Sequence, residues 1–140
     1  MRNIAQALAV ASVLVLATPG CGSKVQQCNE LITEINAAQT AIAGAGASFN
    51  DKEKAKKIHD EIEAEITKIE AVKISDEKLK EHQQKWVDKL TQFNKKMESI
   101  PGAVEKGDPS GLEEISKEIT EVTGEVSALV DETNKYCQGG

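Results

Sequence analysis

Apolar side chains recur at alternating intervals of three and four residues in four successive blocks of this chain. The blocks cover residues 28–49, 55–72, 79–100 and 112–136. This spacing places the apolar side chains along one face of a helix, and it is close to the seven-residue repeat of left-handed helix packing. We therefore predict an all-α chain in which four amphipathic helices share one core.

The predicted helices have similar lengths and short connections, which favours an antiparallel up-down-up-down four-helix bundle. The alternative is a bundle of three long helices, in which the second and third blocks are fused across Ile74-Ser75.

Local signals mark the boundary between the first two helices. Gly44 and Gly46 weaken the end of the first helix. Asn50 followed by Glu53 fits a capping box for the second helix, because the Asn side chain accepts a backbone N–H that has no helical partner.

Further signals bound the third and fourth helices. Ser75 is the predicted N-cap of the third helix, and residues 100–102 (Ile-Pro-Gly) predict its end. Residues 108–109 (Asp-Pro) predict the start of the fourth helix, since proline is tolerated in a first helical turn. Residues 101–111 are then the longest irregular segment. A solvated connection is the favoured interpretation, although this loop is the first place to look for a partner contact.

The opening of the chain has the plan of a secretory signal peptide. Arg2 is followed by an uncharged apolar run over residues 4–17 and then by residues 18–20 (Thr-Pro-Gly). The run of about 14 residues is shorter than the ~20 that a membrane-spanning helix needs. We therefore predict that residues 1–20 are removed. A buried core helix or a short anchor is the alternative.

Residues 17–21 (Ala-Thr-Pro-Gly-Cys) resemble the lipobox of bacterial lipoproteins. In that family, small residues precede a cysteine that becomes the new N-terminus. Gly20 matches the small residue before the cysteine, whereas Thr18 stands where an aliphatic residue is usual. The resemblance implies that the sulfur of Cys21 carries a diacylglycerol and that the new amino group carries a third acyl chain.

Two acyl chains already give stable membrane anchoring. The resemblance therefore implies a lipidated tether over residues 21–27, which holds a helical bundle over residues 28–138 at a membrane. Gly22 is not the aspartate that retains some lipoproteins at the inner membrane, so the outer membrane is the expected location. A plain secreted helical protein, cut before Cys21, is the alternative.

Lipidation of Cys21 leaves two cysteines, Cys28 and Cys137, in an oxidising compartment. In an up-down-up-down bundle the start of the first helix and the end of the fourth lie at the same end. We therefore predict a Cys28–Cys137 disulfide. The alternatives are two unpaired buried thiols or a Cys21–Cys28 pair, which would forbid lipidation.

The histidines and the tryptophan provide no catalytic or metal-binding pattern. His59 and His82 lie on different predicted helices among charged residues, so we expect both to be exposed, and a zinc site needs three or four convergent ligands. Trp86 lies on the apolar stripe of its helix and is predicted to pack in the core. We expect no enzymatic activity, no metal and no cofactor.

The charge of the chain disfavours a polyanionic partner. Loss of Arg2 with the signal peptide changes the formal net charge from −6 to −7, with lysines and glutamates interleaved. Such a chain is poorly suited to nucleic acid or to an anionic membrane surface.

The leading hypothesis is a non-enzymatic, membrane-anchored lipoprotein whose bundle binds a protein or envelope partner. The alternative is a periplasmic carrier of a small ligand. The only sequence feature that favours a carrier is a set of small residues on the first helix, which would leave room for a cavity: Ala38, Gly44, Ala45 and Gly46.

Overall fold

The computed structural model describes residues 23–47 and 49–139, and four long α-helices account for most of them. The helices are α1 (Lys24–Gly44), α2 (Lys52–Ala71), α3 (Glu77–Lys106) and α4 (Pro109–Gln138), with a short 3-10 helix, η1 (Ala45–Ala47), after α1. No strand occurs within the described ranges. The predicted signal peptide over residues 1–20 lies outside them, as does Cys21.

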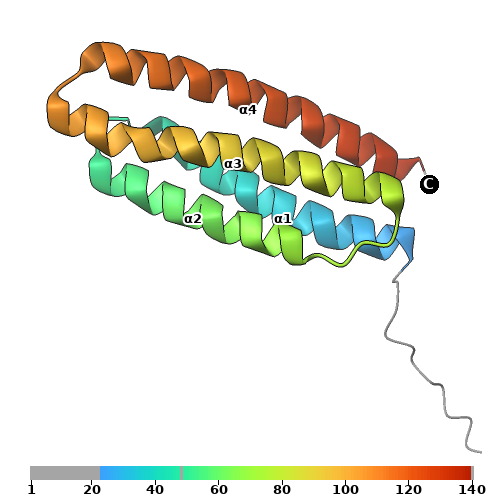
Figure 1. Cartoon of the computed structure of the whole chain (residues 1–140). Helices are drawn as coiled ribbons and strands as arrows, with labels where there is room; N and C mark the ends of the chain where they lie inside the picture. Colours follow the sequence, from blue (N-terminus) through green and yellow to red (C-terminus); the bar gives the residue numbers. More distant parts are fainter. Residues whose placement is uncertain (1–22, 48, 140) are drawn as a thin grey trace, which may run out of the picture.

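Successive helices run in opposite directions, and the predicted four-helix bundle is confirmed (Figure 1). The start of α1, the α2–α3 connection and the end of α4 lie together at one end, which we call the disulfide end. The junction of α1 with α2 and that of α3 with α4 lie at the opposite, far end. The three-helix alternative is wrong, because the backbone is extended at Val72 and again at Asp76.

Two predicted caps are each wrong by one residue. The N-cap of α2 is Asp51 and not Asn50, since the Asp51 carboxylate accepts hydrogen bonds from the backbone N–H groups of residues 53 and 54, both at 3.1 Å. The N-cap of α3 is Asp76 and not Ser75. In both places the residue that follows the predicted cap carries a carboxylate, which favours the positive end of the helix dipole.

The third helix does not end at residues 100–102. Pro101 lies inside α3, which continues to Lys106 and ends at Gly107 in the left-handed conformation (φ 60°). An interior proline costs roughly 3 kcal/mol in helix propensity, but Ile100 is fully buried and Val104 packs against the core, so burial opposes that cost. The predicted loop over residues 101–111 is therefore mostly helical.

The connection that remains between α3 and α4 consists of Gly107 and Asp108. Asp108 caps α4 by accepting a 3.0 Å hydrogen bond from the backbone N–H of Gly111, and Pro109 occupies the first turn. The predicted start of the fourth helix is thus confirmed.

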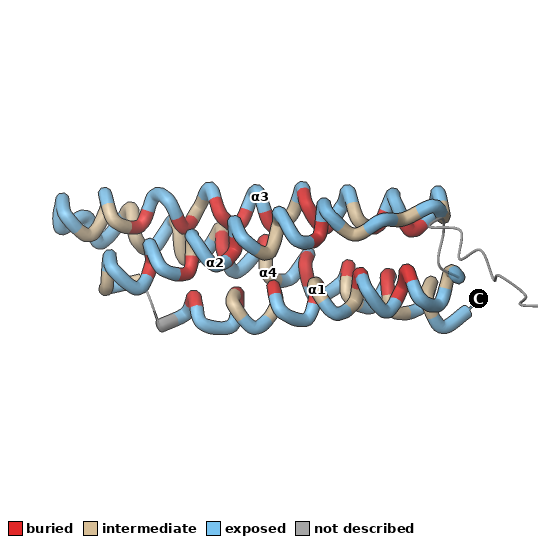
Figure 2. Tube along the Cα trace, turned by 90° about the horizontal axis from the view of Figure 1, so that it is seen from below, coloured by how far each residue is buried: buried red, intermediate tan, exposed pale blue. Residues whose placement is uncertain are grey.

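The apolar stripes face one another along the bundle and form a continuous core (Figure 2). Trp86 and Phe93 of α3 are its largest fully buried side chains, and Leu31 of α1 and Ile62 of α2 are equally buried. The prediction that Trp86 packs in the core is confirmed. Within the described part of the chain, none of the helices combines the length and the apolar character that crossing a membrane requires.

Candidate functional site

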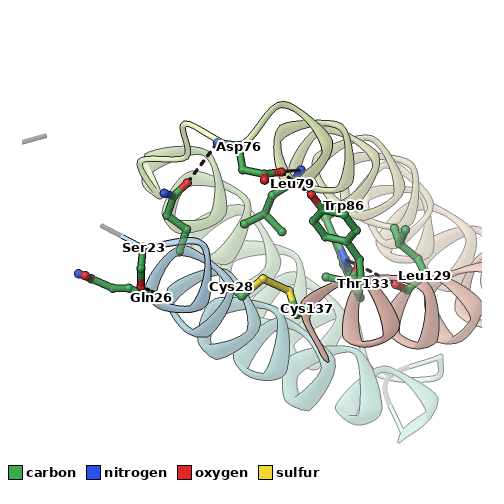
Figure 3. The surroundings of a disulfide bond; sticks show 11 residues. Ser23, Gln26, Cys28, Asp76, Leu79, Trp86, Leu129, Thr133 and Cys137 are labelled. Atoms are coloured by element: carbon green, nitrogen blue, oxygen red, sulfur yellow. Dashed lines mark hydrogen bonds between the residues drawn. A yellow bond between two sulfur atoms is a disulfide. The ribbon is translucent and has the colours of Figure 1, made fainter. Parts of the chain in front are cut away.

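A disulfide between Cys28 and Cys137 joins the second turn of α1 to the last turn of α4 (Figure 3). The two Cα atoms are 5.8 Å apart although 109 positions separate the residues in sequence. The predicted pairing is confirmed, and the alternatives of unpaired thiols and of a Cys21–Cys28 bond do not apply. Lipidation of Cys21 concerns a residue outside the described ranges.

Gln27, beside the disulfide, connects α1 to the start of α3. Its buried side-chain oxygen accepts hydrogen bonds from the backbone N–H groups of Ser75 at 2.7 Å and Asp76 at 3.3 Å, and its amide nitrogen donates to Ser75 Oγ at 3.0 Å. We did not predict a role for Gln27 from the sequence. Gln27 precedes Leu31 by four positions and so lies on the apolar stripe, which is the signal that marks it as buried.

Asp76 links α3 to α4. One carboxylate oxygen, Oδ1, accepts the capping hydrogen bond from the backbone N–H of Leu79 at 2.8 Å and a second from Tyr136 Oη at 2.7 Å. The hydrogen bond from Leu79 lowers the pKa of Asp76 most, and the bond from Tyr136 lowers it further. The same carboxylate raises the pKa of Tyr136. The capping carboxylate therefore also holds the last turn of α4.

Trp86 and Thr133 form a buried polar link between α3 and α4 (Figure 3). The indole Nε1 donates to Thr133 Oγ1 at 3.1 Å, and that hydroxyl donates to the carbonyl oxygen of Leu129 at 2.8 Å. Both polar groups are satisfied inside the core, as buried polar groups usually are.

The prediction that His82 is exposed is wrong, because its side chain is only 1% exposed. It follows Leu79 by three positions and precedes Trp86 by four, so it occupies the apolar stripe of α3. Its ring lies 5.3 Å from that of Tyr136, and burial lowers its pKa. Its Nδ1 has no hydrogen-bond partner and lies 3.9 Å from Oε1 of Glu132.

A surface cleft of about 390 Å³ opens beside this histidine at the disulfide end. It is lined by Lys24, Lys78, His82, Glu132, Lys135, Tyr136 and Gly139. The ammonium group of Lys24 lies 3.9 Å from the centre of the Tyr136 ring, a cation–π contact. We call this the lysine cleft. It places three cationic side chains and a phenol around one opening.

The other histidine, His59, is half-buried on α2, far from His82. Its Nδ1 lies 3.2 Å from Oδ1 of Asp60, and Glu63 is close enough for one ligand atom from each residue to lie within 4.8 Å of the others. Asp60 is also paired with Lys56 at 3.0 Å. The hydrogen bond with His59 lowers the pKa of Asp60 most, and the hydrogen bond with Lys56 lowers it further. The two histidines do not converge on one site.

No family model, no curated protein and no solved structure matches this chain.

Proposed function

We propose that this chain is a lipid-anchored lipoprotein of the bacterial cell envelope whose bundle binds a protein partner without enzymatic activity. The observation that carries the proposal is the disulfide between Cys28 and Cys137. Disulfides persist in oxidising compartments, which fits export, and this bond accounts for two of the three cysteines. Cys21 is then the single remaining thiol, at the end of a lipobox-like stretch. Gly22 favours the outer over the inner membrane.

A protein partner is favoured over a small ligand by the character of the bundle surface. The cleft between α3 and α4 has a volume of about 490 Å³ and lies open to solvent. Its rim carries paired charges, Lys85 with Glu132 at 2.8 Å and Lys89 with Glu125 at 2.6 Å. Small-molecule sites are usually concave pockets lined by apolar side chains, whereas exposed charges suit a polar protein surface.

The anchor is tested by replacing the lipidated atom. We expect wild-type protein produced in a bacterium to sediment with membranes and to enter the detergent phase. The Cys21→Ser variant should lose its acyl chains, and the Cys137→Ser variant should keep them. A Cys21→Ser chain with the same mass increment as the wild type would exclude lipidation.

The partner is tested by cross-linking anchored protein in intact cells, with the Cys21→Ser chain as the matched control. A specific protein captured by the anchored form supports the proposal. A small molecule that co-purifies with the bundle in place of a protein would favour the carrier alternative.

A further inference from the structure

The distance between the proposed anchor and the bundle is very short. Helix α1 begins at Lys24 and is capped by Ser23, whose hydroxyl accepts a hydrogen bond from the backbone N–H of Gln26 at 3.3 Å. The segment expected to be a tether over residues 21–27 is therefore helical from Lys24 onward. Three peptide steps separate Cys21 from Lys24, and they span at most about 11 Å.

An anchor at Cys21 would hold the disulfide end of the bundle close to the lipid headgroups. The helices α3 and α4 have 30 residues each and are about 45 Å long. A tether of that length can bring one end of the bundle to the bilayer but not the other. The groups exposed at the disulfide end are therefore those that meet the membrane.

Two features of that end suit a phospholipid surface. Val25 is 60% exposed, the only large apolar side chain with such exposure in the described part of the chain. It follows Lys24, which lines the lysine cleft together with Lys78 and Lys135. Lys135 forms no ion pair among the described residues. An exposed apolar side chain and lysine ammonium groups at the same end of the bundle match the boundary between acyl chains and headgroup phosphates.

One residue in the wall of the cleft has a buried polar atom without a hydrogen-bond partner. His82 forms part of its wall, and the buried Nδ1 of that ring makes no hydrogen bond. Buried polar atoms are normally paired, and Oε1 of Glu132 lies 3.9 Å from this nitrogen. Glu132 lines the same cleft, with Lys85 as its ion-pair partner.

The ligand need not carry a net negative charge. The acidic balance of the chain disfavours binding that depends on a strongly anionic surface. The phosphate group, however, is present in zwitterionic as well as anionic phospholipids. Lysine ammonium groups donate charge-assisted hydrogen bonds to phosphate oxygens. Part of the cationic charge around the cleft is balanced by Glu81, the ion-pair partner of Lys78, and by Glu132.

We propose that the disulfide end of the bundle lies on the bilayer and that the lysine cleft binds the phosphate group of a phospholipid. This inference rests on the proposed lipid anchor at Cys21. It assigns a lipid-facing surface at one end of the molecule and leaves the far end and the sides for a protein partner.

The test measures how fast each lysine reacts with a water-soluble acylating reagent. It uses the lipid-anchored protein that the cell processes from the full-length chain. The protein is reconstituted into bilayer discs of phosphatidylcholine or of a galactolipid that has no phosphate. Lys24, Lys78 and Lys135 report on the cleft. Lys54, Lys106 and Lys117, in the half of the bundle nearer the far end, serve as internal controls.

We expect the three cleft lysines to react several-fold more slowly in phosphatidylcholine than in galactolipid, because an ammonium group that is hydrogen-bonded to a phosphate oxygen is protected from acylation. The control lysines should change less than twofold. Equal protection in both lipids would mean that the bilayer only covers the lysines, and it would overturn phosphate binding. An absence of protection in both lipids would overturn the lipid-facing surface altogether.

Two further arms separate the remaining explanations. Protection by inorganic phosphate alone, added to galactolipid discs, would identify a site for free phosphate and overturn the lipid assignment. The Lys78→Gln/Lys135→Gln variant should remove the protection of Lys24, whereas Lys106→Gln/Lys117→Gln should retain it. The mass of the protein before labelling reports whether Cys21 is acylated. A chain without acyl groups refutes the proposed function, and the inference fails with it.

Discussion

The hydroxyl group of Tyr136 donates a 2.7 Å hydrogen bond to Oδ1 of Asp76, the residue that caps α3. Tyr136 precedes Cys137, which is bonded to Cys28, and the neighbouring Gln27 accepts a hydrogen bond from the backbone N–H of Asp76. These contacts form a closed ring that joins α1, α3 and α4 at the disulfide end.

The ring predicts that Asp76 and Tyr136 stabilise the bundle jointly. Asp76→Ala removes both the helix cap and the acceptor for Tyr136, so it should lower the urea midpoint more than Asp76→Asn, which keeps an oxygen acceptor. In the Asp76→Ala background, Tyr136→Phe should have a smaller effect than in the wild type, because the hydrogen bond is already lost. Urea unfolding of the four chains measures this coupling, and strictly additive effects would contradict it.

The buried pair of Trp86 and Thr133 provides a second prediction. Thr133→Val keeps the shape of the side chain but leaves the indole N–H without an acceptor, which should cost about 1–3 kcal/mol in the free energy of unfolding. Thr133→Ser retains the hydroxyl and should keep that hydrogen bond, losing only methyl packing. Urea unfolding followed by tryptophan fluorescence compares the variants. Equal stability of the Val variant and the wild type would show that the bond contributes little.

The disulfide should contribute substantially to stability because it closes a long loop. With 109 positions between Cys28 and Cys137, the chain-entropy model gives an upper value of about 4.7 kcal/mol. We expect the Cys28→Ser/Cys137→Ser variant to have a lower urea midpoint than the oxidised wild type and to be insensitive to reductant. A wild-type midpoint that does not change on full reduction would contradict this prediction.

His82 should make the stability depend on pH above the range in which carboxylates titrate. Burial lowers the pKa of His82 below the ordinary value of 6.5, and the positive charges of Lys85 and Lys78 lower it further. The negative charge of Glu132 raises this pKa, and that of Glu81 raises it more weakly. The unfolded chain therefore binds a proton more readily than the folded chain. Stability is fully present above pH 6.5 and declines as the pH falls toward the lower pKa of the folded state.

This dependence is measured by urea unfolding between pH 7.5 and 5.5. We expect His82→Leu to flatten the pH profile over that interval, and His59→Gln, which removes the half-buried histidine of α2, to leave the His82 contribution in place. An identical slope for wild type and His82→Leu would show that the buried ring does not control it.

Helix number and the disulfide were predictable because both follow from regular spacing. The three-and-four repeat of apolar residues depends only on the helical period, and antiparallel connections then bring Cys28 and Cys137 to one end. The caps at Asn50 and Ser75 were wrong by one residue. In each case two neighbouring side chains can cap a helix, and the backbone conformation decides between them.

Tertiary contacts account for the larger differences. The spacing places Ile100 on the apolar stripe, but it does not reveal that Val104 also packs on the core, which carries α3 through Pro101. Gln27 is hydrogen-bonded to Ser75, 48 positions away in the sequence, so the pattern around it marks burial but not its partner. The lysine cleft combines α1, α3 and α4 and appears only when these helices are assembled.

The central claim is that Cys21 is the membrane anchor while Cys28 and Cys137 close the bundle. The most direct measurement is the intact mass of the protein purified from bacterial membranes, with thiol alkylation before and after reduction. We predict a chain that begins at Cys21, carries acyl chains, and gains two alkyl groups only after reduction. A chain that retains residues 1–20, or one whose Cys21 is alkylated without reduction, would contradict it.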